Sequence, residues 1–134
     1  MVRKHNPGLY LILLLLCIAV ICSAGCSQTA TVYTFTEDDN GKTFNVGMDD
    51  IVKVSLFSNP TTGYEWNVDT TGNLVITNVE FISDSAEGMI GAGRVQEWTL
   101  AANAPGTYEF NAVYKRSWED TDADMSYQLT LIFQ

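Results

Sequence analysis

Residues 52–68 read Val-Lys-Val-Ser-Leu-Phe-Ser-Asn-Pro-Thr-Thr-Gly-Tyr-Glu-Trp-Asn-Val, and this stretch decides the fold. Apolar residues recur at alternate positions on both sides of its centre, which is the period-2 pattern of half-buried β-strands. At the centre, Pro60 restricts its own φ and favours extended geometry at Asn59, while Gly63 accepts a positive φ. The two threonines between them are β-branched and have restricted side-chain rotamers. The stretch therefore predicts two strands joined by a stiff turn, which is either simply a turn or a rigid binding loop.

The same alternation recurs at short intervals along the rest of the chain. Strands are predicted at residues 43–46, 51–58, 64–69, 74–83, 94–102, 107–115 and 127–133, with a further short candidate at 31–35. Turn signals rich in glycine, proline and asparagine separate them, and we find no amphipathic helical stretch of useful length. About seven short strands in about 100 residues predict an all-β fold, an immunoglobulin-like antiparallel β-sandwich. The disulfide of antibody domains is missing, and we expect Trp66 and Trp98 in the core.

The first 25 residues contain the three parts of a secretory signal peptide. Arg3 and Lys4 precede an apolar run from Leu9 to Cys22, and small residues follow it. The sequence Ala24-Gly25-Cys26 resembles a lipobox, in which the cysteine is lipidated, although Ser23 stands where leucine is usual. An uncleaved anchor is the alternative, because the run extended through Cys26 reaches the length of a spanning helix. We therefore expect export, either to the outer face of the cell membrane as a lipoprotein or by secretion.

Cleavage before Cys26 would leave 109 of the 134 residues, which is enough for one domain. We expect residues 26–41 to form a tether or an edge strand, and residues 42–134 to form the domain. Sixteen acidic residues against five basic ones give this mature chain a formal charge of −11, which argues against nucleic acid or anionic lipid as the partner. All three cysteines lie at or before position 26, so the domain has no disulfide. We expect a monomer.

The expected domain lacks the residues of the common catalytic sites. Its only cysteine is Cys26 at its N-terminus, and the chain's one histidine, His5, lies in the signal segment. Serine and cysteine triads are therefore excluded, as are zinc sites built on His or Cys. A P-loop motif is missing, and Gly91-Ala92-Gly93 does not fit a dinucleotide fingerprint. We expect no enzyme activity, no cofactor and no metal.

Carboxylates alternate at Asp120, Asp122 and Asp124, as they do in a calcium-binding loop. Met125 and Leu131 replace the glycine and the final glutamate of such a loop, so a solvated acidic loop is the simpler interpretation. A calcium-dependent adhesion or structural domain stays open as an alternative.

Two further segments are predicted to lie beside the central turn. Gly91-Ala92-Gly93-Arg94 leads into one predicted strand, and Tyr114-Lys115-Arg116-Ser117-Trp118 leads out of another. In a sandwich with alternating strand directions, both loops emerge at the same end as residues 59–63. Trp118 lies outside the alternating pattern, so it is either an exposed binding anchor or a side chain folded over the sheet edge.

These three segments, in this order and at this spacing, resemble the signature loops of the chagasin family of cysteine peptidase inhibitors. The first is Asn59-Pro60-Thr61-Thr62-Gly63-Tyr64, the second Gly91-Ala92-Gly93 and the third Arg116-Ser117-Trp118. The similarity extends from Lys42 to Phe133. Two residues depart from the family's pattern: Arg94 replaces the last glycine of Gly-x-Gly-Gly, and Ser117 replaces the proline of Arg-Pro-Trp.

The resemblance implies an exported, reversible inhibitor of papain-like cysteine peptidases that fills the active-site cleft with three loops. It implies that Thr61 and Thr62 lie against the catalytic cysteine, that Gly91–Arg94 clasp one side of the cleft and that Trp118 packs on the other. The peptidase-binding residues would be Asn59, Pro60, Thr61, Thr62, Gly63, Tyr64, Gly91, Ala92, Gly93, Arg94, Arg116, Ser117 and Trp118. The alternative function is a lipid-anchored, immunoglobulin-like surface module that binds a ligand other than a peptidase.

Overall fold

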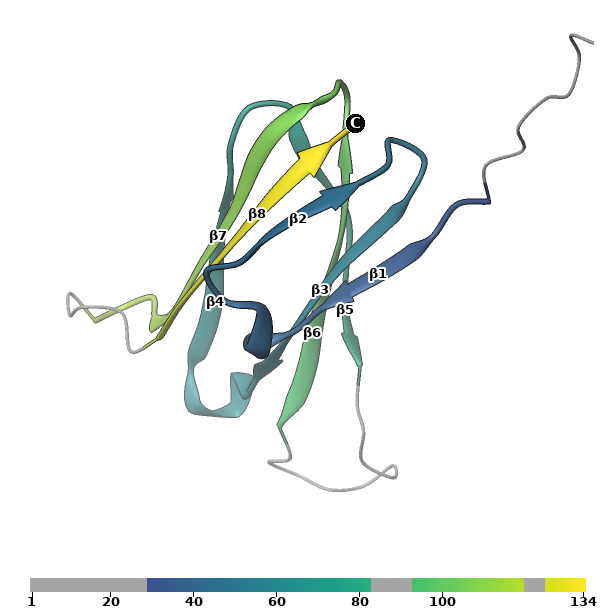
Figure 1. The fold of residues 1–134 in the computed structure, drawn as a ribbon. Helices are drawn as coiled ribbons and strands as arrows, with labels where there is room; N and C mark the ends of the chain where they lie inside the picture. The colour runs from purple at the N-terminus through teal and green to yellow at the C-terminus, as the bar shows by residue number, and fades with distance from the viewer. Residues whose placement is uncertain (1–28, 83–92, 120–124) are drawn as a thin grey trace, which may run out of the picture.

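The computed structural model describes residues 29–82, 93–119 and 125–134. In these residues, eight β-strands follow one another along the chain, with two short 3₁₀ turns among them (Figure 1). The strands are β1 (Val32–Phe35), β2 (Thr43–Val46), β3 (Ile51–Ser58), β4 (Tyr64–Thr70), β5 (Leu74–Ile82), β6 (Arg94–Ala102), β7 (Gly106–Arg116) and β8 (Met125–Phe133), and the turns are η1 (Glu37–Asp39) and η2 (Pro60–Thr62). Within the described ranges, no helix is long and apolar enough to cross a membrane.

The strands form two four-stranded sheets that pack face to face as a sandwich (Figure 1). Sheet A has the order β1-β3-β6-β5, and sheet B has the order β2-β8-β7-β4. The chain crosses between the sheets several times: η1 lies between the edge strands β1 and β2, and η2 leads from β3 in sheet A to β4 in sheet B. The predicted all-β, immunoglobulin-like sandwich is confirmed.

Two edge pairings differ from the antiparallel arrangement that the sequence predicts. β1 pairs with β3 in parallel, and β2 pairs with β8 in parallel, whereas the four other pairings are antiparallel. The partners in each parallel pair are separated by a passage through the other sheet, so no tight turn constrains them to run in opposite directions. The short strand candidate at residues 31–35, named in addition to the seven predicted strands, forms β1 and brings the strands described to eight.

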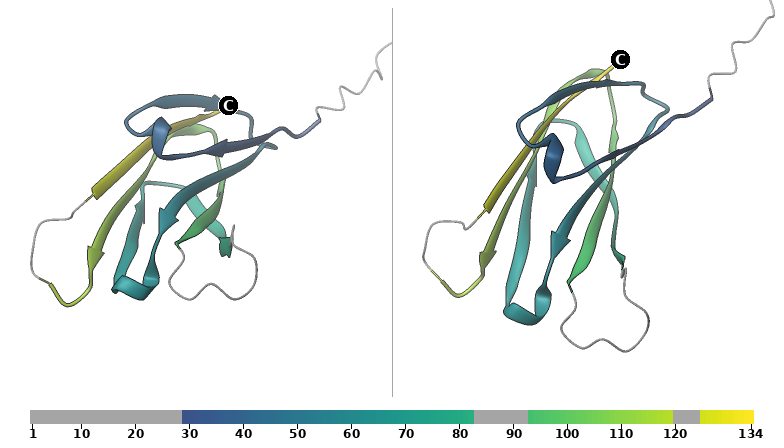
Figure 2. Two further views of the ribbon diagram at one scale, coloured as in Figure 1. Left: turned by 90° about the horizontal axis from the view of Figure 1, so that it is seen from below. Right: turned by 60° about the horizontal axis from the view of Figure 1, so that its bottom comes forward.

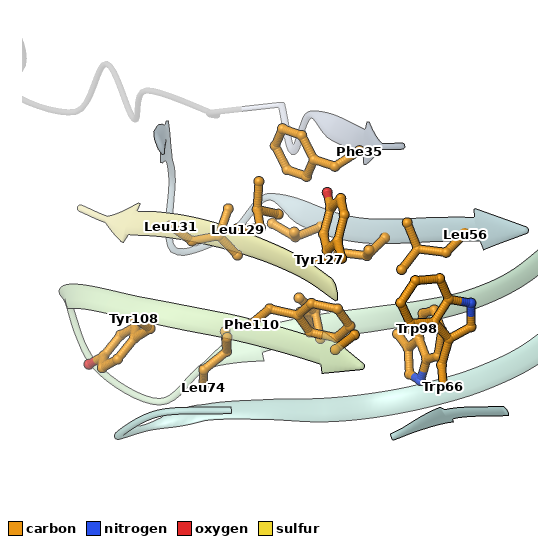
Figure 3. Close-up of a cluster of buried hydrophobic side chains, with 14 of the residues drawn as sticks. Phe35, Leu56, Trp66, Leu74, Trp98, Tyr108, Phe110, Tyr127, Leu129 and Leu131 are labelled. Atoms are coloured by element: carbon orange, nitrogen blue, oxygen red, sulfur yellow. The ribbon is translucent and has the colours of Figure 1, made fainter. Parts of the chain in front are cut away.

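The core lies between the sheets and is built from the alternating apolar residues of the strands. Trp66 and Trp98 are both buried in it, as the sequence predicts (Figure 3). The ring of Trp98 meets Phe110 edge-on at 5.6 Å, and Phe110 meets Tyr127 edge-on at 6.2 Å. Because each large apolar side chain contributes about 1.5–3 kcal/mol when buried, this continuous layer holds the two sheets together without a disulfide.

One carboxylate is buried on the outer face of sheet A. Glu97 on β6 is 6% exposed and accepts hydrogen bonds from Nζ of Lys53 and, at 2.8 Å, from Oγ of Ser55. Burial raises the pKa of Glu97, but the hydrogen bonds from Lys53 and Ser55 outweigh burial and hold the pKa below its ordinary value. Ser55, Glu97 and Glu80 are direct neighbours across three strands, so a polar row crosses this face.

Candidate functional site

The described residues of the three predicted loops lie at one end of the sandwich (Figure 2). In sheet A, Ser58 at the end of β3 pairs with Arg94 at the start of β6. In sheet B, Tyr64 at the start of β4 pairs with Arg116 at the end of β7. The structure therefore brings Asn59–Tyr64, Gly93–Arg94 and Arg116–Trp118 to the same end of the molecule. Gly91 and Ala92, the remaining predicted site residues, lie outside the described part of the chain.

The first loop is the η2 turn, and its backbone has the shape that the sequence predicts. Asn59 has φ −125° and ψ 83°, and Gly63 has a left-handed φ of 80°. The carbonyl of Asn59 accepts hydrogen bonds from the amide of Thr62 at 3.2 Å and from its hydroxyl at 2.7 Å. The hydroxyl of Thr61 donates to Oδ1 of Asn59 at 2.6 Å, and the amide of Gly63 donates to the carbonyl of Pro60 at 3.1 Å. Pro60, Thr61 and Thr62 are nevertheless exposed, so the turn presents an internally bonded tip to solvent.

Aromatic side chains support this turn from inside the sandwich. The hydroxyl of Tyr114 accepts a hydrogen bond from the amide of Asn59 at 2.9 Å. The Tyr114 ring stacks on Tyr64 at 5.3 Å and contacts Trp66 at 4.9 Å. Trp66 in turn donates through Nε1 to the carbonyl of Phe57 at 2.9 Å. Both ends of the turn are therefore tied to buried rings that cannot move without disturbing the core.

Trp118 is exposed and packs over the first loop. Its side chain is the most exposed large apolar one described, at 69%. A Cβ atom at position 63 would lie 2.1 Å from Cη2 of Trp118, so the indole ring lies directly on Gly63. The glycine thus has two roles, because it supplies the positive φ and also leaves room for the ring. Trp118 is thus exposed and at the same time folded over the first loop, and its role as a binding anchor stays a prediction.

Arg116 joins the first and third loops. Its Nε donates to the carbonyl of Thr62 at 3.2 Å, and its guanidinium lies 4.5 Å from the centre of the Tyr64 ring. Its Nη1 forms an ion pair with Oε1 of Glu119 at 2.9 Å, across a turn in which the amide of Glu119 donates to the carbonyl of Arg116. The third loop has Ser117 where the resemblance implies a proline, and the contacts of Arg116 with Thr62 and Glu119 restrain this loop instead.

Phe57 packs on a glycine at the base of the second loop, as Trp118 packs on Gly63 in the first. A Cβ atom at position 93 would lie 2.0 Å from Cε2 of Phe57, so the phenyl ring covers Gly93 as the indole covers Gly63. Arg94, the next residue, is exposed and begins β6. The glycine at position 93 is therefore required for close approach within this chain, whatever the loop binds.

Sequence reasoning misses the roles of Phe57 and Glu119. Phe57 carries a detectable signal, because it is an aromatic residue in the outward-facing register of β3, after Lys53 and Ser55. Glu119 lies three residues after Arg116, a spacing too common to be informative without the turn geometry.

The described part of the site offers exposed contact groups on an internally bonded turn. The hydroxyls of Thr61 and Thr62 are both bonded to Asn59. Within the described ranges, no group of three or more His, Cys, Asp or Glu side chains could hold a metal ion. Asp120, Asp122 and Asp124, considered above for calcium, lie outside these ranges, as does the lipidation candidate Cys26.

The segment that contains all three loops matches one known family. A sequence model described as chagasin family peptidase inhibitor I42 matches residues 45–131, which include all three loops. The chain belongs to the chagasin family. Chagasin-family proteins are peptidase inhibitors and not enzymes, which agrees with the expectation that this chain has no enzyme activity. The family assignment does not favour the alternative of a surface module with a non-peptidase ligand.

Other members and structural neighbours resemble this chagasin-family chain over most of its length. Amoebiasin-1 of Entamoeba histolytica is 31% identical over 102 residues, which are 75% of this chain and 99% of amoebiasin-1. The crystal structure of the cysteine protease inhibitor EhICP2 from the same organism has a TM-score of 0.73 at 23% identity, covering 80% of this chain and 99% of that one. The structure of PbICP-C in complex with falcipain-2 has a TM-score of 0.54 at 14% identity, covering 79% and 93%. Both structures share the β-sandwich.

Proposed function

We propose that the chain is an exported, reversible inhibitor of papain-like cysteine peptidases that occludes the active-site cleft with three loops. The η2 turn enters the centre of the cleft, with Thr61 and Thr62 against the catalytic cysteine. Gly91–Arg94 contact one wall of the cleft, and Trp118 packs on the other.

The observation that carries this proposal is the closed geometry of the η2 turn. Cleavage requires a carbonyl carbon about 3–3.5 Å from the nucleophile, with its oxygen free to enter an oxyanion hole. In this turn the carbonyl oxygens of Asn59, Pro60 and Thr62 already accept hydrogen bonds from Thr62, Gly63 and Arg116. The 3₁₀ backbone also presents no extended peptide. The turn can therefore cover a catalytic cysteine and histidine and resist cleavage by them.

Preorganisation supports tight binding. Fixing a flexible loop on association costs about 0.5–1.5 kcal/mol for each side chain immobilised. The tip of the first loop is already bonded to itself, and Trp118 already lies on Gly63. Three loop tips can supply the ~800 Å² per partner of a standard-sized interface. An exposed tryptophan at its edge has the character of a binding hot spot.

Relatives support the choice of target class. EhICP2 is described as a cysteine protease inhibitor, and PbICP-C has been solved in complex with falcipain-2. We propose the same class of partner for this chain, on the basis of the family assignment and the three loops together.

Titration of papain and of a cathepsin L-type enzyme with the chain tests this function. We expect a stoichiometric and reversible loss of activity. The double variant Thr61→Arg and Trp118→Ala should no longer inhibit. The arginine side chain is too large for the centre of the cleft, and the second change removes the tryptophan anchor. Thr107→Arg is the matched control, since Thr107 is an exposed threonine on β7 near the opposite end of the sandwich. Failure of the folded chain to inhibit either enzyme would contradict the proposal.

Export and anchoring form a separate part of the proposal. Residues 1–25 would be removed as a signal peptide, and Cys26 would carry the lipid. Residues 26–41 would connect the anchor to the inhibitory domain at residues 42–134, and β1 (Val32–Phe35) within them is itself paired into sheet A. Producing cells fed with radiolabelled palmitate should label the wild-type chain in the membrane fraction and leave Cys26→Ser unlabelled. Recovery of unlabelled wild-type chain from the medium would indicate secretion instead.

A further inference from the structure

A row of three apolar side chains crosses the outer face of sheet A at its loop end. Phe57 on β3 and Ile82 on β5 both pair with Val95 on β6, so the three are direct cross-strand neighbours. Side chains of such neighbours lie about 5 Å apart and form a continuous surface. Phe57 is 52% exposed and Ile82 is 40% exposed, and Val95 between them is half-buried.

This apolar row adjoins the proposed peptidase-binding loops. Phe57 and Val95 lie one residue from the Ser58–Arg94 pair, where sheet A ends, which is a distance of about 3.3 Å along a strand. The Phe57 ring covers Gly93 at the base of the second loop. The row is therefore continuous with the site at Gly93 and Arg94.

Position distinguishes this row from the exposed apolar pair towards the other end of sheet A. Val32 and Ile51 form a cross-strand pair that is comparably exposed, at 56% and 42%, towards the other end of sheet A. Beyond the apolar row, in the direction away from the loops, comes the polar row of Ser55, Glu97 and Glu80. A body docked on the loops would meet the apolar row first, and could not reach Val32 or Ile51 without covering the acidic groups.

We propose that Phe57, Val95 and Ile82 extend the peptidase-binding surface beyond the three loops. They contact the peptidase outside its cleft, on the surface next to the wall that the second loop clasps. This inference rests on the proposed function and specifies the partner more closely. The complementary surface is apolar opposite Phe57 and Ile82. Glu80 beside them is 50% exposed, and its Oε1 lies 4.0 Å from Nζ of Lys53, which also pairs with Glu97. One lysine therefore faces two carboxylates, and the complementary surface there is neutral or basic. Peptidases with such a surface beside the cleft would be bound more tightly than those with an acidic one.

Inhibition constants of the full chain against papain and a cathepsin L-type enzyme test this surface. The row variants are Phe57→Thr and Ile82→Thr, and the matched controls are Val32→Thr and Ile51→Thr, since threonine keeps a β-branched side chain suited to strands. We expect each row variant to raise the inhibition constant about five- to tenfold against at least one enzyme, and each control to change it less than twofold. Thermal unfolding of every variant identifies losses that come from misfolding.

Three results would overturn the inference in distinguishable ways. Row variants that inhibit as tightly as the controls, while the wild-type chain inhibits, would remove the surface and leave the proposed function standing. A loss with Phe57→Thr alone would reduce Phe57 to a residue that positions Gly93. A folded wild-type chain that inhibits neither enzyme would overturn the proposed function and this partner together. Should Ile82→Thr fail to fold, Val95→Thr replaces it in the same comparison.

Discussion

Gly63→Ala separates the conformational role of Gly63 from its role as a platform for Trp118. Gly63 has φ 80°, and a Cβ atom there would lie 2.1 Å from the Trp118 ring. Gly41 has nearly the same backbone conformation, φ 76°, but nothing lies within 4 Å of the position of its Cβ. The two alanine variants therefore share the backbone strain and differ in the displacement of the indole.

The expected changes in stability and in inhibition follow from the backbone strain and from the displacement of the indole ring. A left-handed conformation costs a non-glycine residue about 1–2 kcal/mol. Each kcal/mol lowers the melting temperature of a domain of this size by about 4–8 °C. Since Trp118 is 69% exposed, its ring can move aside at little cost to the fold, and we expect similar melting temperatures for the two variants. Inhibition should differ, because only Gly63→Ala displaces the proposed anchor.

The assay is the inhibition constant against papain, measured beside thermal unfolding. We expect Gly63→Ala to inhibit about tenfold more weakly than Gly41→Ala, which corresponds to about 1.4 kcal/mol of binding. Equal inhibition constants for the two variants would refute the reasoning that Gly63 places Trp118 for binding. A much lower melting temperature for Gly63→Ala would show that the indole is held more firmly than its exposure indicates.

Three further predictions concern single residues. Trp118→Ala should cost about 2–4 kcal/mol of binding with little change in the melting temperature, and unchanged inhibition would remove Trp118 from the site. Pro60→Ala should weaken inhibition by loosening the first loop before binding, and an equal affinity would count against preorganisation. Glu97 has a folded-state pKa below its ordinary value, so the ionised carboxylate stabilises the fold above about pH 4.5, near the pKa of an unfolded glutamate. This stabilisation is lost as the pH falls through the lower folded-state pKa. Glu97→Gln should therefore flatten the loss of stability in acid, as measured by urea unfolding between pH 6 and pH 3, and an unchanged acid profile would assign that loss to other carboxylates.

The fold was largely predictable because several strands contain their own signal. Alternation at Trp98 and Leu100 on β6, or at Tyr127 and Leu129 on β8, specifies an inward face regardless of which strand lies next to it. The parallel pairings of β1 and β2 were not predictable in this way. A local pattern shows that a segment is a strand, but neither its partner nor its direction.

The same limit applies to the site. The positive φ of Gly63 follows from the local sequence, and the structure has it. The contact of Trp118 with Gly63 joins residues 55 positions apart, and the contact of Phe57 with Gly93 joins residues 36 positions apart. Neither glycine shows in the sequence which ring will cover it. Strand order places Arg116 at the same end as the first loop and the resemblance assigns it to the site, but only the structure reveals that it links Thr62 to Glu119.

Protection of the peptidase's catalytic thiol tests the central claim, occlusion of the active site, most directly. Papain would be incubated with a small alkylating reagent alone, with a stoichiometric amount of the chain, or with the Thr61→Arg and Trp118→Ala double variant, and alkylation of the active-site cysteine followed by mass spectrometry. The account predicts that the wild-type chain blocks alkylation, that the double variant does not, and that unmodified, active papain is recovered when the complex dissociates. Alkylation at the uninhibited rate in the presence of a stoichiometric amount of folded wild-type chain would contradict it.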